Sequence, residues 1–438
     1  MKKTYRIIAA ALCALMLILT VSCSGKTDPV TDQITEPTVT TGEEGPVTAP
    51  DTETEPAGSE PEPTEKTPPV TNIQTWTYND GIRVMMGIFC ETEPGALVYV
   101  CRRNGEVLIR EHALEKNFFG AYHLPDGENG VTVYIYAKED GKLISDPSDA
   151  VRLKYVYDAD GNLVCGHSSF IGHDSHVYLN YYDEFYYGRV LVDEEMKANV
   201  RRYLEGQLGR IREATGKNTK IIMIVCTNPA VIYHDMQYDE SEGGRGDHFE
   251  PTSVTQFGEY MKDSEDIYFL DLRDILMEHR DKLLFMQADS HWTQIGAYYG
   301  YYRAAQCVHK DFPSVPVYDL EKDFDTEIVQ NGGDLLWFMG ISDRVSAYTA
   351  NVTPKDASMY AKDDFPTAYV MGDSYYGAIS PFLELLFSEI YLNHPDTNPP
   401  LYDYRLDDLE TKKPDYLVYI WTERNILGDL GMLLNVRH

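Results

Sequence analysis

Residues 220–226 read Lys-Ile-Ile-Met-Ile-Val-Cys, a continuous apolar run with a single charge at its start. A run of this length without polar alternation is typical of a strand that is buried on both faces, as in a parallel sheet covered by helices. After it, strand patterns and helix patterns alternate to the end of the chain. This alternation predicts an α/β fold built on a parallel, mostly doubly wound sheet.

Local signals place the elements of this fold. Asp193 is a suitable N-cap for a helix that extends to about Thr215, and Gly216 is a suitable stop. Because ligands in open α/β sheets bind at the carboxyl ends of the strands, functional residues are expected at those ends. The other expected elements are strands at Ile267–Leu272, Ala368–Met371, Glu389–Asn393 and Tyr416–Trp421, and helices at Thr293–Val308 and Gly377–Phe387.

The triplet Gly372-Asp373-Ser374 lies at one of these strand ends, directly before a helix. Gly372 permits a tight turn there. The helix N-terminus supplies free N–H groups and a partial positive charge, which suit an oxyanion. The triplet alone occurs by chance in loops, but this strand–turn–helix context predicts a functional role for Ser374.

A second motif, Asp289-Ser290-His291-Trp292-Thr293, comes just before another predicted helix. In a non-helical segment, residues two apart project their side chains to the same side, so Asp289 and His291 are expected to be adjacent. A carboxylate beside an imidazole fixes its tautomer and stabilises the imidazolium. The alternative is that Asp289 caps the helix and His291 lies on the surface.

Together the two motifs resemble a known family. Asp-x-His-Trp followed by Gly296-Ala297, with Gly-Asp-Ser later in the chain, is similar to the SGNH-hydrolase-like domain of the alginate O-acetyltransferases and of the related DHHW proteins. The resemblance covers roughly residues 160–438, and Ser290 stands where DHHW proteins carry a second His. Supporting segments are Asn228–Tyr233, Gly332–Leu335 and Pro414–Arg424.

The resemblance implies a catalytic role for three residues. Ser374 would be the nucleophile, His291 the general base and Asp289 its orienting partner. An acetyl group would pass through an acetyl-serine onto hydroxyls of a cell-surface polysaccharide. In the family a partner membrane-bound O-acyltransferase delivers the acetyl group, so a donor of this kind is implied. No nucleotide-binding glycine loop is present, and no cofactor or metal is expected.

Four further residues are predicted to contact the substrate. Asn228 follows a strand end and is a candidate second oxyanion donor, although it could equally cap the following turn. Arg405 could reach the site or simply begin a helix. Tyr375 and Tyr376 directly follow Ser374 and are expected to stack on sugar rings.

Two alternative functions remain open from the sequence. An SGNH-type carbohydrate acetyl esterase would use the same three residues with water as the acceptor. A non-catalytic glycan-binding surface lipoprotein would combine a β-domain with an inactive hydrolase-like domain. The intact set of Asp289, His291 and Ser374 argues against the second alternative.

The first 23 residues predict a lipoprotein signal peptide. A basic start is followed by the apolar run Ile7–Val21 and by Cys23, in a relaxed version of a bacterial lipobox. Cleavage would leave Cys23 as a lipidated N-terminus, whereas the alternative is an ordinary signal peptide with an incidental cysteine. The protein is therefore expected to be extracytoplasmic and lipid-anchored to a bacterial membrane, at the cell surface or in the periplasm.

Two segments separate this signal from the α/β domain. Residues 24–75 are rich in Thr, Pro and Glu and contain no aromatic residue, which predicts a disordered linker. Residues 76–157 show short alternating runs separated by turns and resemble bacterial Ig-like domains, which predicts a β-sandwich that binds glycan or acts as a spacer. The SGNH-hydrolase-like domain is then expected at 158–438.

Charge and cysteine content exclude several classes of protein. The formal net charge is −32, from 70 acidic against 38 basic residues, which speaks against nucleic-acid binding. The cysteines after Cys23 form no CxxC pair, so neither a zinc site nor a disulfide framework is implied, although a Cys90–Cys101 bridge stays open. His167, His173 and His176 are expected to pack rather than to bind a metal.

Overall fold

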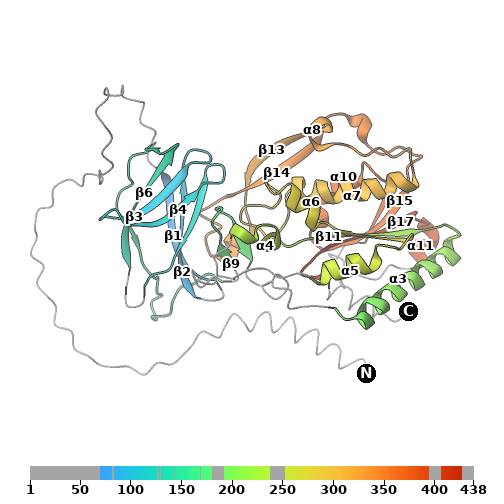
Figure 1. Ribbon diagram of the computed structural model, residues 1–438, viewed down its shortest axis with the longest axis horizontal. Coiled ribbons are helices and arrows are strands. Elements are labelled where there is room, and N and C mark those ends of the chain that lie inside the picture. Colours follow the sequence, from blue (N-terminus) through green and yellow to red (C-terminus); the bar gives the residue numbers. More distant parts are fainter. Residues whose placement is uncertain are drawn as a thin grey trace, which may run out of the picture. The chain divides into compact units, whose positions relative to one another are not determined.

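A computed structural model gives the fold of the chain (Figure 1). The predicted signal peptide with Cys23 and almost all of the predicted linker lie outside the residues that it describes. Within the described part, no helix is both long and apolar enough to cross a membrane. The described residues are 70–80, 83–125, 128, 130–143, 145–167, 169–179, 192–236, 252–393 and 406–426.

The N-terminal part of the described chain consists of two antiparallel sheets over a common apolar core. Strand β6 alternates buried with half-buried residues along its length, as expected for a strand with one face on a core. One sheet has the order β1 (Thr71–Asn79), β2 (Val84–Glu91), β5 (Asn117–Tyr122). The other has the order β4 (Val107–His112), β3 (Leu97–Arg102), β6 (Val131–Glu139), β7 (Lys142–Leu143), with β8 (Val151–Leu153) also paired to β6.

Two details of this part differ from the sequence-based expectation. Strand β1 begins at Thr71, upstream of Trp76, because it pairs along its length with β2 and so extends into the predicted linker. Cys90 and Cys101 lie in strands of different sheets, and both are free thiols buried in the core. The bridge left open by the sequence is therefore not formed.

The C-terminal part contains the predicted parallel sheet. Its strand order is β12-β11-β17-β15-β16, and each neighbouring pair is parallel. All five strands were expected from the sequence, and their observed bounds agree within two residues. They are β11 (Lys220–Cys226), β12 (Ile267–Asp271), β15 (Thr367–Gly372), β16 (Glu389–Asn393) and β17 (Tyr416–Thr422).

Helices cover both faces of this sheet (Figure 1), which confirms the doubly wound α/β class. Alternate residues of β11 point to opposite faces, with Ile221 in the cluster under α3 and α5 and Ile222 in the cluster under α7 and α10. The first face carries α3 (Glu194–Thr215), α5 (Ser253–Met261) and α11 (Leu406–Lys412), and the second carries α6 (Arg273–Glu278), α7 (Gln294–Asp311) and α10 (Tyr376–Leu383).

Helix α3 begins and ends at the predicted caps. The Asp193 side chain accepts a hydrogen bond from the Met196 N–H at 2.7 Å. Gly216 has a φ of 71°, a left-handed conformation that glycine adopts without steric cost.

An antiparallel hairpin that the sequence did not indicate lies against α7, where the Val352 N–H donates to Gln294 Oε1. It consists of β13 (Phe324–Asn331) and β14 (Ala347–Pro354), with the short helix α9 (Asp334–Phe338) in the connection between them. Most of β13 is exposed, so its sequence lacks the apolar alternation that announces a strand. Short elements complete the fold, namely β9 (Ser169–Ile171), β10 (Val177–Leu179), α4 (Pro229–Ile232), η2 (His234–Met236), α8 (Leu320–Asp323) and η4 (Ala357–Met359).

Buried polar contacts join the antiparallel sheets to the α/β part. The Asn117 amide donates to Gln287 Oε1 at 3.1 Å and to the Ser346 carbonyl at 2.8 Å. Asn117 and Gln287 are both fully buried. Such pairs have no water to replace a lost partner, so they fix the two segments against each other.

The histidines near residue 170 pack as expected. His173 Nδ1 lies 2.6 Å from Glu111 Oε1. His176 is buried, with its ring stacked on Tyr233 at 5.5 Å. His167 packs against Phe338 with 5.8 Å between ring centroids.

Candidate active site

A tight turn after β15 presents Ser374 at the carboxyl edge of the sheet. The Asp373 carboxylate holds this turn, because Oδ1 accepts from the Tyr375 N–H and Oδ2 accepts from the Thr422 N–H, each at 3.0 Å. Thr422 belongs to β17, so the turn is tied to the neighbouring strand. Asp373 is itself buried, whereas Ser374 is exposed and comes just before α10.

A closed loop before α7 carries the second motif. The Met286 N–H donates to the His291 carbonyl at 3.1 Å, and this bond closes the loop that holds Asp289 at its tip. Thr293, rather than Asp289, caps α7 by accepting from the Ile295 and Gly296 N–H groups. The alternative interpretation of Asp289 as a helix cap is therefore wrong.

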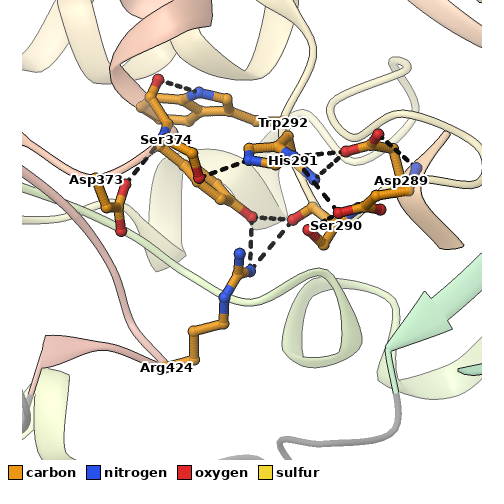
Figure 2. A network of polar contacts seen from close by, with 9 residues as sticks. Asp289, Ser290, His291, Trp292, Asp373, Ser374 and Arg424 are labelled. Atoms are coloured by element: carbon orange, nitrogen blue, oxygen red, sulfur yellow. Dashed lines mark hydrogen bonds and ion pairs between the residues drawn. The ribbon is translucent and has the colours of Figure 1, made fainter. Parts of the chain in front are cut away.

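The two motifs meet in a line of hydrogen bonds (Figure 2). His291 Nδ1 lies 2.6 Å from Asp289 Oδ1, and His291 Nε2 lies 2.7 Å from Ser374 Oγ. Since an ionised carboxylate only accepts, Nδ1 carries the proton and Nε2 is free to accept from the serine hydroxyl. The arrangement is that of a Ser-His-Asp triad.

A second carboxylate, which sequence reasoning did not single out, supports this line. The Asp334 N–H donates to Asp289 Oδ2 at 2.9 Å. The Asp334 carboxylate accepts from the Ser290 N–H at 2.7 Å and from the Ser290 hydroxyl at 2.6 Å. Its Oδ2 lies 3.9 Å from His291 Nδ1. The only sequence signal was the similarity of Gly332–Leu335 to a turn of the family.

Close backbone packing places Asp334 beside the triad. A Cβ atom on Gly333 would lie 2.0 Å from the Ala288 carbonyl oxygen, so only glycine fits there. Asp289, His291 and Asp334 offer possible metal-ligand atoms within 4.8 Å of one another. Both imidazole nitrogens are already bonded to Asp289 and Ser374, so we interpret the cluster as a hydrogen-bond network.

The two carboxylates differ in the direction of their pKa shifts. Burial raises the pKa of Asp289, but the hydrogen bond and charge of His291 outweigh it, so this pKa lies below its usual value. Burial, together with repulsion from Asp289, holds the pKa of Asp334 above its usual value despite its bonds to Ser290. Asp289 is therefore the firmly ionised partner of His291.

Tyr375 forms the base of the site, and the prediction that it stacks on sugar is wrong. It is 1% exposed, and its ring centroid lies 5.1 Å from that of His291 and 5.3 Å from that of Trp292. Its hydroxyl donates to the Ser290 carbonyl and accepts from Arg424 Nη1 at 3.0 Å. The side chain is held inward by these contacts and has no face left for a ligand.

Two other predicted substrate residues, Tyr376 and Asn228, do not line the cavity at Ser374. Tyr376 is half-buried and packs against the main core. Asn228 is 2% exposed and faces a smaller pocket with Asp289, Ser290 and Arg424, and its two amide atoms have no partner among the described residues. Arg405 lies outside the described residues.

A cavity of about 290 Å³ opens beside Ser374 and His291. The loop before α7 and α7 itself contribute one side, α10 contributes the second, and the β13–β14 hairpin contributes the third. The Ser374 N–H has no hydrogen-bond partner among the described residues, so it can donate to an oxyanion at this site.

Part of the chain matches a known family. Residues 185–389 match the family model described as "SGNH hydrolase-like domain, acetyltransferase AlgX". This segment is an SGNH hydrolase-like domain. It includes Asp289, His291 and Ser374, whereas β17 and Arg424 lie beyond the matched residues.

Solved structures show the same kind of similarity at low identity. The O-acetyltransferase domain of Pseudomonas putida AlgJ is 17% identical, with 62% of this chain and 100% of that chain covered and a TM-score of 0.38. A DHHW family protein from Eubacterium siraeum is 13% identical, with 71% and 98% covered and a TM-score of 0.38. Bacillus cereus PatB1 with a sulfonyl adduct is 12% identical, with 62% and 99% covered and a TM-score of 0.44. No curated protein matches the chain.

The family assignment rests on the family model, which describes an acetyltransferase. At the level of the family, this match supports an acyltransferase activity for the SGNH hydrolase-like domain.

Proposed function

We propose that this protein is a serine-dependent O-acetyltransferase that moves an acetyl group through an acetyl-serine onto hydroxyls of a cell-surface polysaccharide. The observation that carries the proposal is the line of hydrogen bonds from Asp289 through His291 to Ser374, which ends at an open cavity. The family model supports acetyl transfer as the type of reaction.

The first half-reaction loads the serine. His291 Nε2 takes the proton from Ser374 Oγ as this oxygen attacks the carbonyl carbon of an acetyl donor. The bond from the carbonyl carbon to the donor oxygen then breaks, and His291 returns the proton to that leaving oxygen. Asp289 stabilises the imidazolium that exists between these two steps.

The second half-reaction repeats the same steps with a sugar hydroxyl. His291 removes the hydroxyl proton, the sugar oxygen attacks the acetyl-serine, and the proton returns to Ser374 Oγ as its bond to the acetyl carbon breaks. The Ser374 N–H donates to the oxyanion in both tetrahedral intermediates. Water in place of the sugar would give the esterase alternative with the same residues.

The setting of the reaction belongs to the same proposal. The predicted lipoprotein signal would place the domain outside the cytoplasm, on a bacterial membrane. No acetyl-CoA is available there, so a membrane-bound O-acyltransferase is the proposed source of the acetyl group. The antiparallel sheets before the catalytic domain are proposed to be an Ig-like spacer or glycan-binding module.

Ester cleavage with and without a glycan acceptor tests the proposal. The chain without its first 23 residues would be given a chromogenic acetyl ester, and acetyl on the glycan would be read by mass spectrometry. Ser374→Ala should lower the rate on the order of 10⁴- to 10⁶-fold. Ser358→Ala is the matched control, because Ser358 is exposed in η4.

The outcomes separate the candidate functions. Serine-dependent cleavage with acetyl appearing on sugar supports the transferase. Cleavage that releases only acetate, across a range of acceptors, favours the esterase. Equal rates for the wild type and Ser374→Ala in a folded chain would reject both and favour the glycan-binding protein.

A further inference from the structure

The hairpin side of the cavity presents uncharged hydrogen-bonding groups. Asn331, Thr349 and Asn351 from β13 and β14 line it together with Gln294 from α7. Among the described residues that line the cavity, none is Lys, Arg, Asp or Glu.

Strand register places these hairpin residues on one face. Asn331 pairs with Ala347, so Thr349 and Asn351 follow at successive steps of two along β14. Residues two apart on a strand share a face, and directly opposed residues on antiparallel strands share it too. Asn331, Thr349 and Asn351 therefore point to the same side of the hairpin.

Two of the amides are oriented to offer donors. Gln294 Oε1 accepts from the Val352 N–H at 2.7 Å, and Asn331 Oδ1 accepts from the Gly332 N–H at 2.8 Å. With their oxygens engaged, the NH₂ groups are left without partners among the described residues. Each NH₂ group donates two hydrogen bonds, which suits the hydroxyl and ring oxygens of a sugar.

The same face also carries a negative charge. Glu327 lies directly opposite Asn351 in the hairpin, and its side chain is therefore on the face with Asn331 and Thr349. A sugar carboxylate bound here would lose its hydration without meeting a cation among the lining residues, and Glu327 would repel it. The cavity thus disfavours an anionic sugar.

The size of the cavity limits what it holds. About 290 Å³ is at the low end of the range for ligand pockets, which begins at roughly 300 Å³. Met286, Trp292 and Ala378 make part of the lining apolar, beside the Ser374 hydroxyl. One sugar ring with its acetyl group fits this space, with the acetyl methyl against the apolar part.

We propose that this hairpin face is the acceptor subsite and that the acceptor hydroxyl belongs to an uncharged sugar ring, not to a uronic acid. The inference rests on the proposed function and adds the substrate class to it. Gln294, Asn331, Thr349 and Asn351 bind the ring, and Glu327 discriminates against carboxylates.

Matched acceptors test the charge preference in the chain without its first 23 residues. Tetrasaccharides of glucose, galactose and mannose are each compared with the same tetramer oxidised to the carboxylate at C6 and with its methyl ester. The methyl ester lacks both the C6 hydroxyl and the charge. We expect kcat/KM for acetyl transfer to be at least about tenfold higher for the best neutral tetramer and for its methyl ester than for the carboxylate.

Two variants assign the preference to the hairpin. Asn351→Ala should lower kcat/KM about tenfold for neutral acceptors. Glu327→Gln should raise use of the carboxylate acceptor several-fold, so the ratio of kcat/KM for the neutral acceptor to kcat/KM for the carboxylate acceptor should fall. Glu213→Gln is the control, because it removes the same charge from an exposed position on α3 across the sheet.

The results that overturn this inference differ from those that overturn the proposed function. Equal or better use of the carboxylate tetramers, with serine-dependent ester cleavage intact, would overturn only the substrate class. If no tetramer is acetylated, binding of each tetramer to Ser374→Ala is measured by calorimetric titration. The absence of binding by the neutral tetramers would also overturn the proposed substrate class. Loss of serine-dependent cleavage altogether would be a failure of the proposed function.

Discussion

At the scale of single residues, the triad histidine lies between two carboxylates. Asp289 holds His291 Nδ1 at 2.6 Å, and Asp334 Oδ2 lies 3.9 Å from the same nitrogen. The second carboxylate also binds Ser290 through both of its oxygens. Asp334 is therefore a positioning residue that also adds negative potential at the imidazole.

Asp334→Asn tests the electrostatic part of this role. The amide oxygen can still accept from the Ser290 N–H, but the charge near His291 is gone. Less stabilisation of the imidazolium favours the neutral imidazole, so the acid limb of kcat/KM should move to lower pH. The measurement is ester cleavage against pH, with the exposed Asp343→Asn as control. An unmoved acid limb would contradict the role.

The same substitution has a predicted effect on stability. Because the pKa of Asp334 is raised in the fold, the contribution of this group is fully present below the pKa of the unfolded chain and is lost as pH rises through the folded pKa. The ionised group therefore opposes folding at neutral pH. Asp334→Asn should have an equal or higher Tm at pH 7, and its advantage should shrink as pH falls through the pKa of Asp334. A lower Tm at pH 7 would contradict this assignment.

The three triad residues could be predicted from the sequence because their signals are local. Asp289 and His291 are two residues apart, and Ser374 follows a strand directly, so their relation needed no knowledge of packing. Tyr375 was predicted wrongly because its direction depends on Ser290 and Arg424, which are distant in the chain. Asp334 was missed for the same reason.

At the scale of elements, the contact between α9 and the closed loop before α7 depends on a single glycine. A Cβ on Gly333 would lie 2.0 Å from the Ala288 carbonyl oxygen, whereas a Cβ on Gly332 would meet no atom within 4 Å. Gly333→Ala should therefore push α9 away, lower stability by about 1–3 kcal/mol and reduce ester cleavage. Gly332→Ala is the matched control in thermal melts and rate assays. Equal behaviour of the two variants would contradict the packing argument.

The elements themselves were predictable where burial dictates the pattern. The strands of the parallel sheet read as apolar runs because helices cover both faces. The β13–β14 hairpin was missed because its first strand is largely exposed and polar, and because α9 separates the two strands. The hairpin side of the cavity could therefore not be predicted from the sequence.

At the scale of the whole molecule, the formal charge of −32 acts on every acceptor before it reaches the cavity. A neutral acceptor does not respond to this field, whereas an anionic one is repelled, and salt screens the repulsion. We predict that kcat/KM for neutral tetramers changes less than about twofold between roughly 20 and 500 mM salt, while the value for carboxylate tetramers rises. A fall with salt for carboxylate acceptors would indicate a cationic binding surface instead.

The antiparallel strands and the α/β elements were predictable from the pattern of the sequence, but the contact between them was not. Asn117 and Gln287 are far apart in the chain and neither is apolar, yet both are fully buried where the antiparallel sheets meet the α/β part. Polar side chains at such a contact carry no periodic signal. The antiparallel strands could thus be predicted from their sequence pattern, while their contact with the α/β part could not.

The proposed function depends most directly on an acetyl group passing through Ser374. The decisive measurement is peptide mass spectrometry of the chain after brief exposure to an activated acetyl ester, before and after a glycan acceptor is added. We expect one acetyl group on the peptide that contains Ser374, absent in Ser374→Ala, and its transfer to the glycan when the acceptor is present. Acetylation of the glycan by Ser374→Ala at the rate of the wild type would contradict the account.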